Sequence, residues 1–142
     1  MNLEKLAKLL GYAGLIPFVV FSLGTWVTLP LVDNPHFVLM TYAAIILSFM
    51  GAIHWGVAMS RSSAAELTQL GLSVIPALIG WLALLVASVY GYLLLIFCFS
   101  TLFLADRSAT NAGLLPQWYL PMRMVLTTVV VLCLIFAALA AM

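Results

Sequence analysis

The chain has 142 residues, of which 66% are hydrophobic and only 6% are charged, and its formal net charge is +1. A soluble domain with so few charged residues would expose large apolar patches, so lipid must be its main solvent. The near-neutral charge and the lack of any basic run exclude a nucleic-acid-binding surface. We therefore expect an all-α integral membrane bundle, a single domain over residues 1–142 that contacts the lipid bilayer.

Five segments are long and apolar enough to cross a membrane. A span needs roughly 20 apolar residues, because each residue of a helix advances 1.5 Å through about 30 Å of hydrocarbon. An amphipathic lead precedes the first segment, and the turn Asp33-Asn34-Pro35 suits the start of the second. The predicted helices cover about 9–29, 36–60, 67–86, 91–105 and 122–141, and the longest loop is 106–121.

The basic residues predict the orientation of the bundle. In this layout all of them fall at one face of the membrane, whereas the opposite loops and the C-terminus contain none: Lys5, Lys8, Arg61, Arg107 and Arg123. Cytoplasmic loops carry an excess of Lys and Arg. We therefore expect the N-terminus, and the loop 106–121, to be cytoplasmic and the C-terminus to lie outside.

A faint internal repeat links the first and third predicted helices. Leu-Gly and Ile-Pro pairs occur in the same order in Leu10–Pro17 and in Leu70–Pro76. The similarity is either a true duplication, with parallel copies related by an axis along the membrane normal, or a coincidence between apolar helices. The sequence leaves both interpretations open.

His54 is the one ionisable side chain that this layout places inside a span, since all four acids fall in loops or at helix ends. Ionisable groups inside a membrane are costly and are functional candidates by default. His54 is either a neutral histidine bonded to a neighbouring helix or a proton relay or ligand contact. The other candidate contact residues gather at the cytoplasmic end of the bundle: Trp55, Asp106, Arg107, Trp118, Tyr119 and Arg123.

Small residues at every fourth position mark a second face of the helix 36–60. They are Ser48, Ala52, Gly56 and Ser60. Such stripes let the backbones of two membrane helices approach closely. With His54 on the other side, we expect this helix to lie at the centre of the bundle.

The sequence lacks the residue patterns that several kinds of catalytic, metal-binding and cofactor sites require. The sequence contains no H-E-x-x-H, G-x-S-x-G or P-loop pattern, so we predict no catalytic residues, metal site or cofactor. His36 and His54 lie roughly 27 Å apart along one helix, which is too far for both to hold one haem.

Several short stretches in this order resemble domain-of-unknown-function family 3429, the small multi-pass membrane proteins that include transmembrane protein 69. The stretches are Leu10–Phe18, Tyr42 with Ile46–Phe49, Ile53–Gly56, Asp106-Arg107, and Trp118-Tyr119 before Arg123. The resemblance covers nearly the whole chain and implies a compact helical membrane protein of bacteria or mitochondria, but no activity. Since no Arg- and Ser-rich leader precedes the first helix, we expect a bacterial inner-membrane member.

Three functions compete. The favoured one is a non-enzymatic accessory or assembly factor for membrane proteins or lipids, whose partner is another membrane protein or a second copy of the chain. The alternative is a small carrier or channel for protons, a neutral metabolite or a lipid-like molecule, with His54 as its switchable group. The third is a quinone- or lipid-modifying enzyme with His54 as general base, which would need a cofactor or partner.

Overall fold

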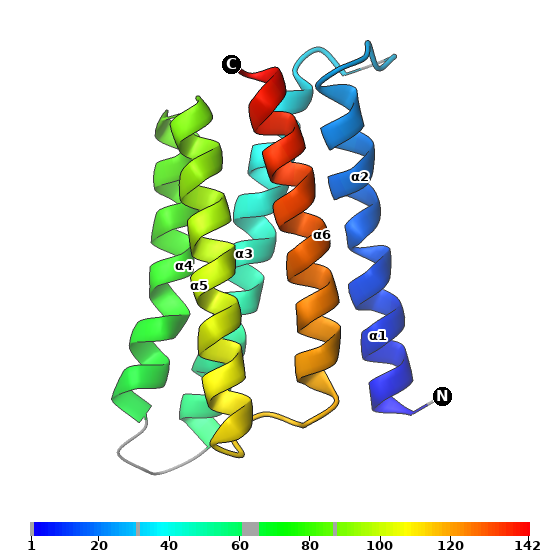
Figure 1. The fold of residues 1–142 in the computed structure, drawn as a ribbon. Helices are drawn as coiled ribbons and strands as arrows, with labels where there is room; N and C mark the ends of the chain where they lie inside the picture. Colours follow the sequence, from blue (N-terminus) through cyan, green and yellow to red (C-terminus); the bar gives the residue numbers. More distant parts are fainter. Residues whose placement is uncertain (1, 31, 61–65, 87) are drawn as a thin grey trace.

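A computed structural model describes residues 2–30, 32–60, 66–86 and 88–142 as a bundle of helices (Figure 1). Five stretches of these residues are long and apolar enough to cross a membrane, which confirms the predicted number of spans. The helices are α1 (Leu3–Ala13), α2 (Leu15–Gly24), α3 (Pro35–Ser60), α4 (Glu66–Val86), α5 (Val89–Asn111) and α6 (Tyr119–Ala140). The first span consists of α1 and α2 laid end to end.

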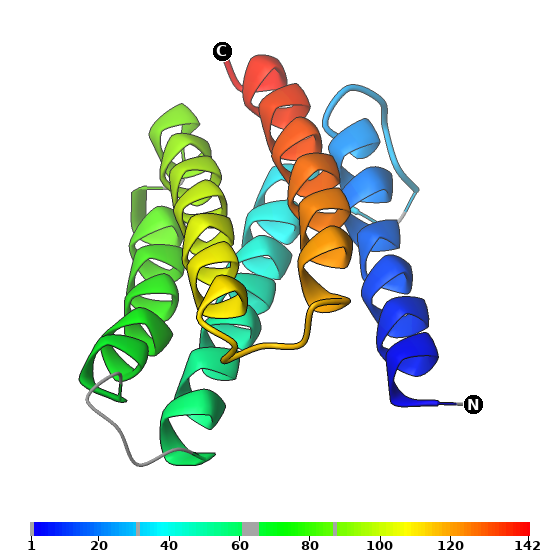
Figure 2. The same ribbon diagram turned by 60° about the horizontal axis from the view of Figure 1, so that its bottom comes forward.

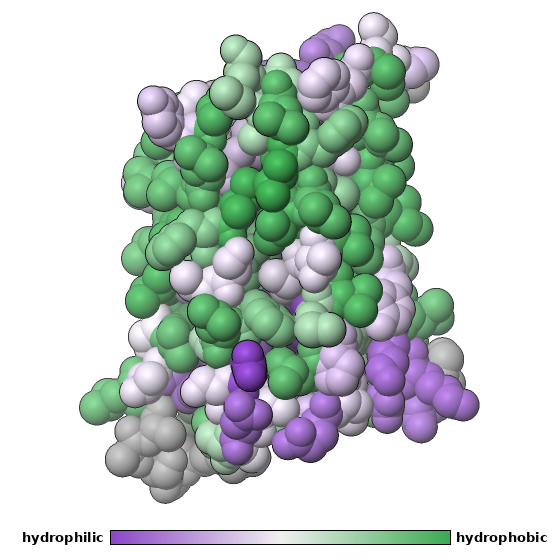
Figure 3. Space-filling model, viewed as in Figure 1, coloured by the Kyte–Doolittle hydropathy of each residue, from purple (hydrophilic) through white to green (hydrophobic). Residues whose placement is uncertain are grey.

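The helices run up and down side by side, and the two termini lie at opposite ends of the bundle (Figures 1 and 2). α3 packs against α2, α4 and α5, while α6 packs against α5 and against the α1–α2 pair. Figure 3 shows an apolar surface across the middle of one face, with hydrophilic residues gathered at its ends. An apolar middle with polar ends is the surface expected of a protein that spans a bilayer.

The first span differs from its predicted boundaries of 9–29. It begins at Leu3, where the Asn2 side chain accepts a hydrogen bond from the Lys5 amide at 2.9 Å, and it ends at Gly24. The amphipathic lead is therefore part of the helix. α1 and α2 separate near Gly14, since Pro17 has no N–H and its ring would clash with the carbonyl four residues earlier.

α5 is longer than the predicted helix 91–105. It continues to Asn111, and α6 begins at Tyr119, so the predicted loop 106–121 shortens to residues 112–118. Gly113 follows the C-cap residue of α5, and its φ of 72° lets the Leu114 amide donate to the Ala109 carbonyl at 2.9 Å. Asp106 therefore lies inside the bundle rather than in a loop.

The apolar core has two parts along α5. The larger cluster includes Leu95, Phe99 and Leu102, and the smaller one includes Ala109 together with Tyr119 of α6. Asp106 lies between them in the sequence of α5. The polar residues described below are thus enclosed by apolar packing on both sides.

α3 and α4 approach closely through glycines other than those of the predicted stripe. A Cβ on Gly51 would lie 2.6 Å from the Ser73 carbonyl oxygen, and one on Gly80 would lie 3.2 Å from the Ala44 Cβ. The stripe residues are Ser48, which is half-buried, and Ala52, Gly56 and Ser60, which are exposed on α3.

The contrast between Gly51 and Gly56 gives a matched test of this packing. Gly51→Ala should lower the free energy of unfolding by about 1–3 kcal/mol relative to Gly56→Ala, because only the first methyl group meets backbone atoms. Both substitutions gain the same helix propensity, so their difference isolates the contact. Unfolding in a mild detergent measures it, and equal stabilities would contradict the close α3–α4 approach.

Candidate functional site

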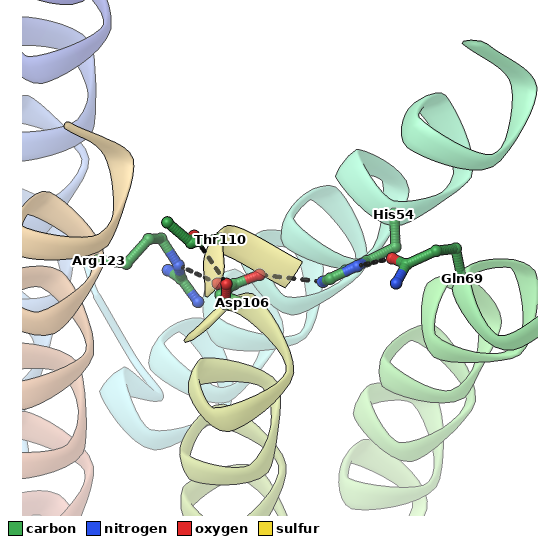
Figure 4. Close-up of polar contacts among 5 residues, drawn as sticks. All are labelled: His54, Gln69, Asp106, Thr110 and Arg123. Atoms are coloured by element: carbon green, nitrogen blue, oxygen red, sulfur yellow. Dashed lines mark hydrogen bonds and ion pairs between the residues drawn. The ribbon is translucent and has the colours of Figure 1, made fainter. Parts of the chain in front are cut away.

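Four polar side chains from four helices form one hydrogen-bonded line across the bundle (Figure 4). His54 Nδ1 lies 2.5 Å from Oε1 of Gln69, and His54 Nε2 lies 2.9 Å from Oδ1 of Asp106. The Arg123 Nε–H donates to the other carboxylate oxygen, Asp106 Oδ2, at 2.6 Å. We call Gln69, His54, Asp106 and Arg123 the buried polar cluster; it joins α4, α3, α5 and α6.

The cluster is almost completely shielded from solvent and lipid. His54 and Asp106 are 0% exposed, Arg123 is 2% exposed and Gln69 is 7% exposed. A buried ion costs several kcal/mol unless it is paired and hydrogen-bonded. Asp106 meets this requirement on both carboxylate oxygens, so its charge is compensated from two sides.

Both ring nitrogens of His54 are engaged. Nδ1 faces Gln69 and Nε2 faces Asp106, so the ring is held by a polar partner on each side. A neutral ring donates from one nitrogen and accepts at the other, with the Gln69 amide turned to donate, whereas an imidazolium donates from both. In either form His54 shares the single carboxylate of the cluster with Arg123.

An apolar pocket of about 420 Å³ adjoins the Arg123 end of the cluster. Its wall is formed by one side of the α1–α2 span together with parts of α3, α5 and α6. Most of the lining is aliphatic or aromatic and includes Leu6, Leu10, Phe18, Phe49, Phe99 and Leu126. The polar side chains in the wall are Tyr119, Arg123 and Thr127.

All three of these polar side chains have a buried atom without a hydrogen-bond partner among the described residues. The atoms are Arg123 Nη2, the Tyr119 hydroxyl oxygen and Thr127 Oγ1. The Tyr119 hydroxyl approaches Asp106 without reaching hydrogen-bond geometry. Because buried polar atoms in native proteins nearly always have partners, three unpartnered groups around one pocket indicate a site for a polar molecule.

The structure brings together His54, Asp106 and Arg123 from the predicted candidates, and it places Tyr119 beside them. Trp118 packs edge-on against Tyr119, with 6.3 Å between the ring centroids. Asp106 bonds to Arg123 of α6, whereas its sequence neighbour Arg107 is exposed on α5.

Trp55 lies away from the cluster. Trp55 is 47% exposed, and its indole N–H donates to the Met59 sulfur on the same helix at 2.9 Å. Arg61, which contributes to the predicted orientation, lies outside the described residues.

Sequence reasoning missed Gln69 and Thr127. Gln69 is an amide side chain near the start of a predicted span, and such residues commonly hydrogen-bond across membrane helices, so its position was a usable signal. Thr127 gives no such signal, because threonines are common in membrane helices. Among the described residues, no group of three or more His, Cys, Asp or Glu side chains could hold a metal ion.

A helical bundle with five apolar spans and a buried polar cluster is a multi-pass membrane protein. The chain belongs to the family described as "Protein of unknown function (DUF3429)", which matches residues 3–139 and confirms the resemblance seen in the sequence.

Curated relatives carry the name Transmembrane protein 69. The protein of Xenopus tropicalis is 45% identical over 83 residues, which are 57% of this chain and 33% of the relative. The protein of Mus musculus is 34% identical over 87 residues, which are 60% of this chain and 36% of the relative. The aligned part is thus about a third of the length of these relatives, and no solved structure matches the chain.

The ion pair of Asp106 and Arg123 predicts a large stability difference between two arginines. Arg123→Met should destabilise the folded protein by roughly 3–5 kcal/mol, because it leaves the buried carboxylate with one fewer partner. Arg107→Met, on the exposed side of α5, is the control and should change stability by less than about 0.5 kcal/mol. Unfolding in detergent measures both.

A compensating change tests the same pair. Adding Asp106→Asn to Arg123→Met removes the unpaired charge and should recover part of the lost stability. The two charges are not coupled if the loss of stability in the double variant equals the sum of the losses in the two single variants.

Proposed function

We propose that this protein is a non-enzymatic accessory protein that holds one lipid-like molecule in the pocket between the α1–α2 span, α3, α5 and α6. The observation that carries the proposal is the combination of an apolar wall with three unpartnered, buried polar groups. A volume of about 420 Å³ falls within the roughly 300–1,000 Å³ usual for ligand pockets. A ligand that matches this wall has a long apolar part and a small polar part.

The pairing within the buried polar cluster favours a binding role over a catalytic one. A general base needs a free acceptor within hydrogen-bond reach of a substrate proton. Both nitrogens of His54 are already engaged, as are both carboxylate oxygens of Asp106. These side chains therefore support the shape of the pocket rather than supply a base to it.

The bacterial inner membrane, with the N-terminus cytoplasmic, is the location that we propose. The start of α1 and the end of α5 lie at the same end of the bundle (Figure 1). These parts of the two helices carry Lys5, Lys8 and Arg107. The stretches of sequence that follow α2, α4 and α6 contain no Lys or Arg before the next helix or the last residue given. The positive-inside rule then assigns the first end to the cytoplasm.

A lipid-binding accessory protein should lose its ligand when the pocket is filled. Ala7→Phe places a large ring in the pocket wall. It should reduce the amount of co-purified lipid several-fold, because the ring occupies the space of the lipid's hydrocarbon chain. Ala52→Phe, on the exposed side of α3, is the matched control and should retain the lipid.

Native mass spectrometry in mild detergent counts the lipid bound to each variant. Equal occupancy in both variants would place the lipid outside the pocket. Loss of a co-purifying protein in Ala52→Phe alone would instead support an assembly role through the exposed small residues of α3.

One observation favours the carrier alternative. The buried polar cluster forms a continuous line from Gln69 on α4 to Arg123 in the pocket wall, and the titratable His54 lies within it. If the protein moves its ligand or protons across the membrane, His54→Gln should abolish flux in proteoliposomes while leaving lipid occupancy intact. Flux that persists at the original rate would remove His54 from any transport step.

A further inference from the structure

Resting on the proposed function, we infer that the pocket selects a single-chain lipid with an oxyanion head, a carboxylate or a phosphate, bound at Arg123, Tyr119 and Thr127. Fatty acids and lipid phosphate monoesters share this chemistry.

The donor groups around the pocket call for acceptor oxygens. A guanidinium N–H can only donate, so Arg123 Nη2 needs an acceptor from the ligand. The hydroxyl groups of Tyr119 and Thr127 also lack partners and can donate as well. All three residues line one pocket, and all are at least nine-tenths buried, at 2%, 7% and 8% exposure. A head with several acceptor oxygens satisfies them together.

The guanidinium of Arg123 favours an anion over a neutral acceptor. Arg123 shares the single carboxylate of Asp106 with His54, and its Nη2 has no partner among the described residues. A buried guanidinium N–H gains most from an acceptor that is itself charged. An alcohol or an ester would accept the same hydrogen bond but would make a weaker one. Arginine binds carboxylates and phosphates through charge-assisted hydrogen bonds.

The depth of Arg123 matches the position of a lipid head. Arg123 lies four residues after the first residue of α6, which is roughly 6 Å along the helix axis. His54, on the opposite side of the cluster, lies six residues before the end of α3, which is roughly 9 Å. The oxyanion would therefore sit near the boundary between headgroups and hydrocarbon.

The apolar wall continues from the head into the bundle. Along the α1–α2 span the lining runs from Leu3 to Phe18, which is roughly 22 Å of helix. A Cβ on Gly11 would lie 3.5 Å from the sulfur of Met122, next to Arg123, so roughly 10 Å of this wall, from Gly11 to Phe18, is left for the chain on the inner side of the head. The volume of about 420 Å³ lies at the lower end of the range for ligand pockets, which favours one chain over two.

Three single-chain probes with the same number of carbon atoms test the head: palmitate, hexadecyl phosphate and hexadecanol. Binding to the delipidated 142-residue chain in detergent is measured by displacement of a fluorescent fatty acid. We expect palmitate or hexadecyl phosphate to bind at least about tenfold more tightly than hexadecanol, because only an anion forms a charge-assisted hydrogen bond with Arg123. The tighter of the two anions identifies the source of the head.

Two conservative variants locate the head without breaking the ion pair of Asp106 and Arg123. Tyr119→Phe and Thr127→Val each remove one unpartnered hydroxyl group, and each should weaken binding of the preferred anion by about three- to tenfold. Binding of hexadecanol should change less. Thr128→Val is the matched control, since the exposed Thr128 hydroxyl already donates to the Met124 carbonyl at 2.8 Å.

The outcomes separate the two proposals. If hexadecanol binds as tightly as both anions, the oxyanion inference is overturned while the lipid-binding function stands. If none of the three probes binds, the lipid-binding function is overturned as well. If an anion binds but neither Tyr119→Phe nor Thr127→Val weakens it, the head lies elsewhere and this site assignment fails.

Discussion

The carboxylate of Asp106 is the group on which the arrangement of the bundle depends. It is completely buried, and its two oxygens connect His54 on α3 with Arg123 on α6. Hydrophobic contact between membrane helices has little directional preference, because lipid tails are as apolar as the side chains. Hydrogen bonds are directional, so those of Asp106 supply the preference that apolar contacts lack. They fix the rotation of α3, α5 and α6 about their axes, and with it the faces that line the pocket.

The pocket is a consequence of how the first span packs. α1 and α2 contact α6 along the bundle, and α2 also contacts α3, but the apolar side chains of α1 leave space beside α6. The break near Gly14 is fixed by the Tyr42 hydroxyl of α3, which donates to the Gly14 carbonyl at 2.9 Å. The same tyrosine packs edge-on against Phe18, whose ring lines the pocket. A single side chain of α3 thus holds both the break and part of the wall.

The number of spans could be predicted from the sequence because hydrophobic length alone decides it. The inward position of His54 could also be predicted, since an ionisable group avoids lipid. The burial of Asp106 could not. The Asp-Arg-Ser sequence at 106–108 is polar enough for a loop, and only the partners on α3 and α6 make a helical, buried Asp106 favourable. Those partners are distant in sequence, and a pattern within one segment carries no information about them.

The pairing of Asp106 with Arg123 also bears on how the chain enters a bilayer during synthesis. The two residues lie on consecutive helices joined only by residues 112–118. α5 inserted alone would carry an unpaired carboxylate into the membrane, and α6 alone would carry an unpaired guanidinium. On translocon scales each charge costs up to roughly 2.5–3.5 kcal/mol at a helix centre and less near the helix ends, where these two residues lie. Neutralising both charges within one helical hairpin removes much of that barrier, so the ion pair favours joint insertion of α5 and α6, after which the hairpin docks onto His54 of the earlier α3.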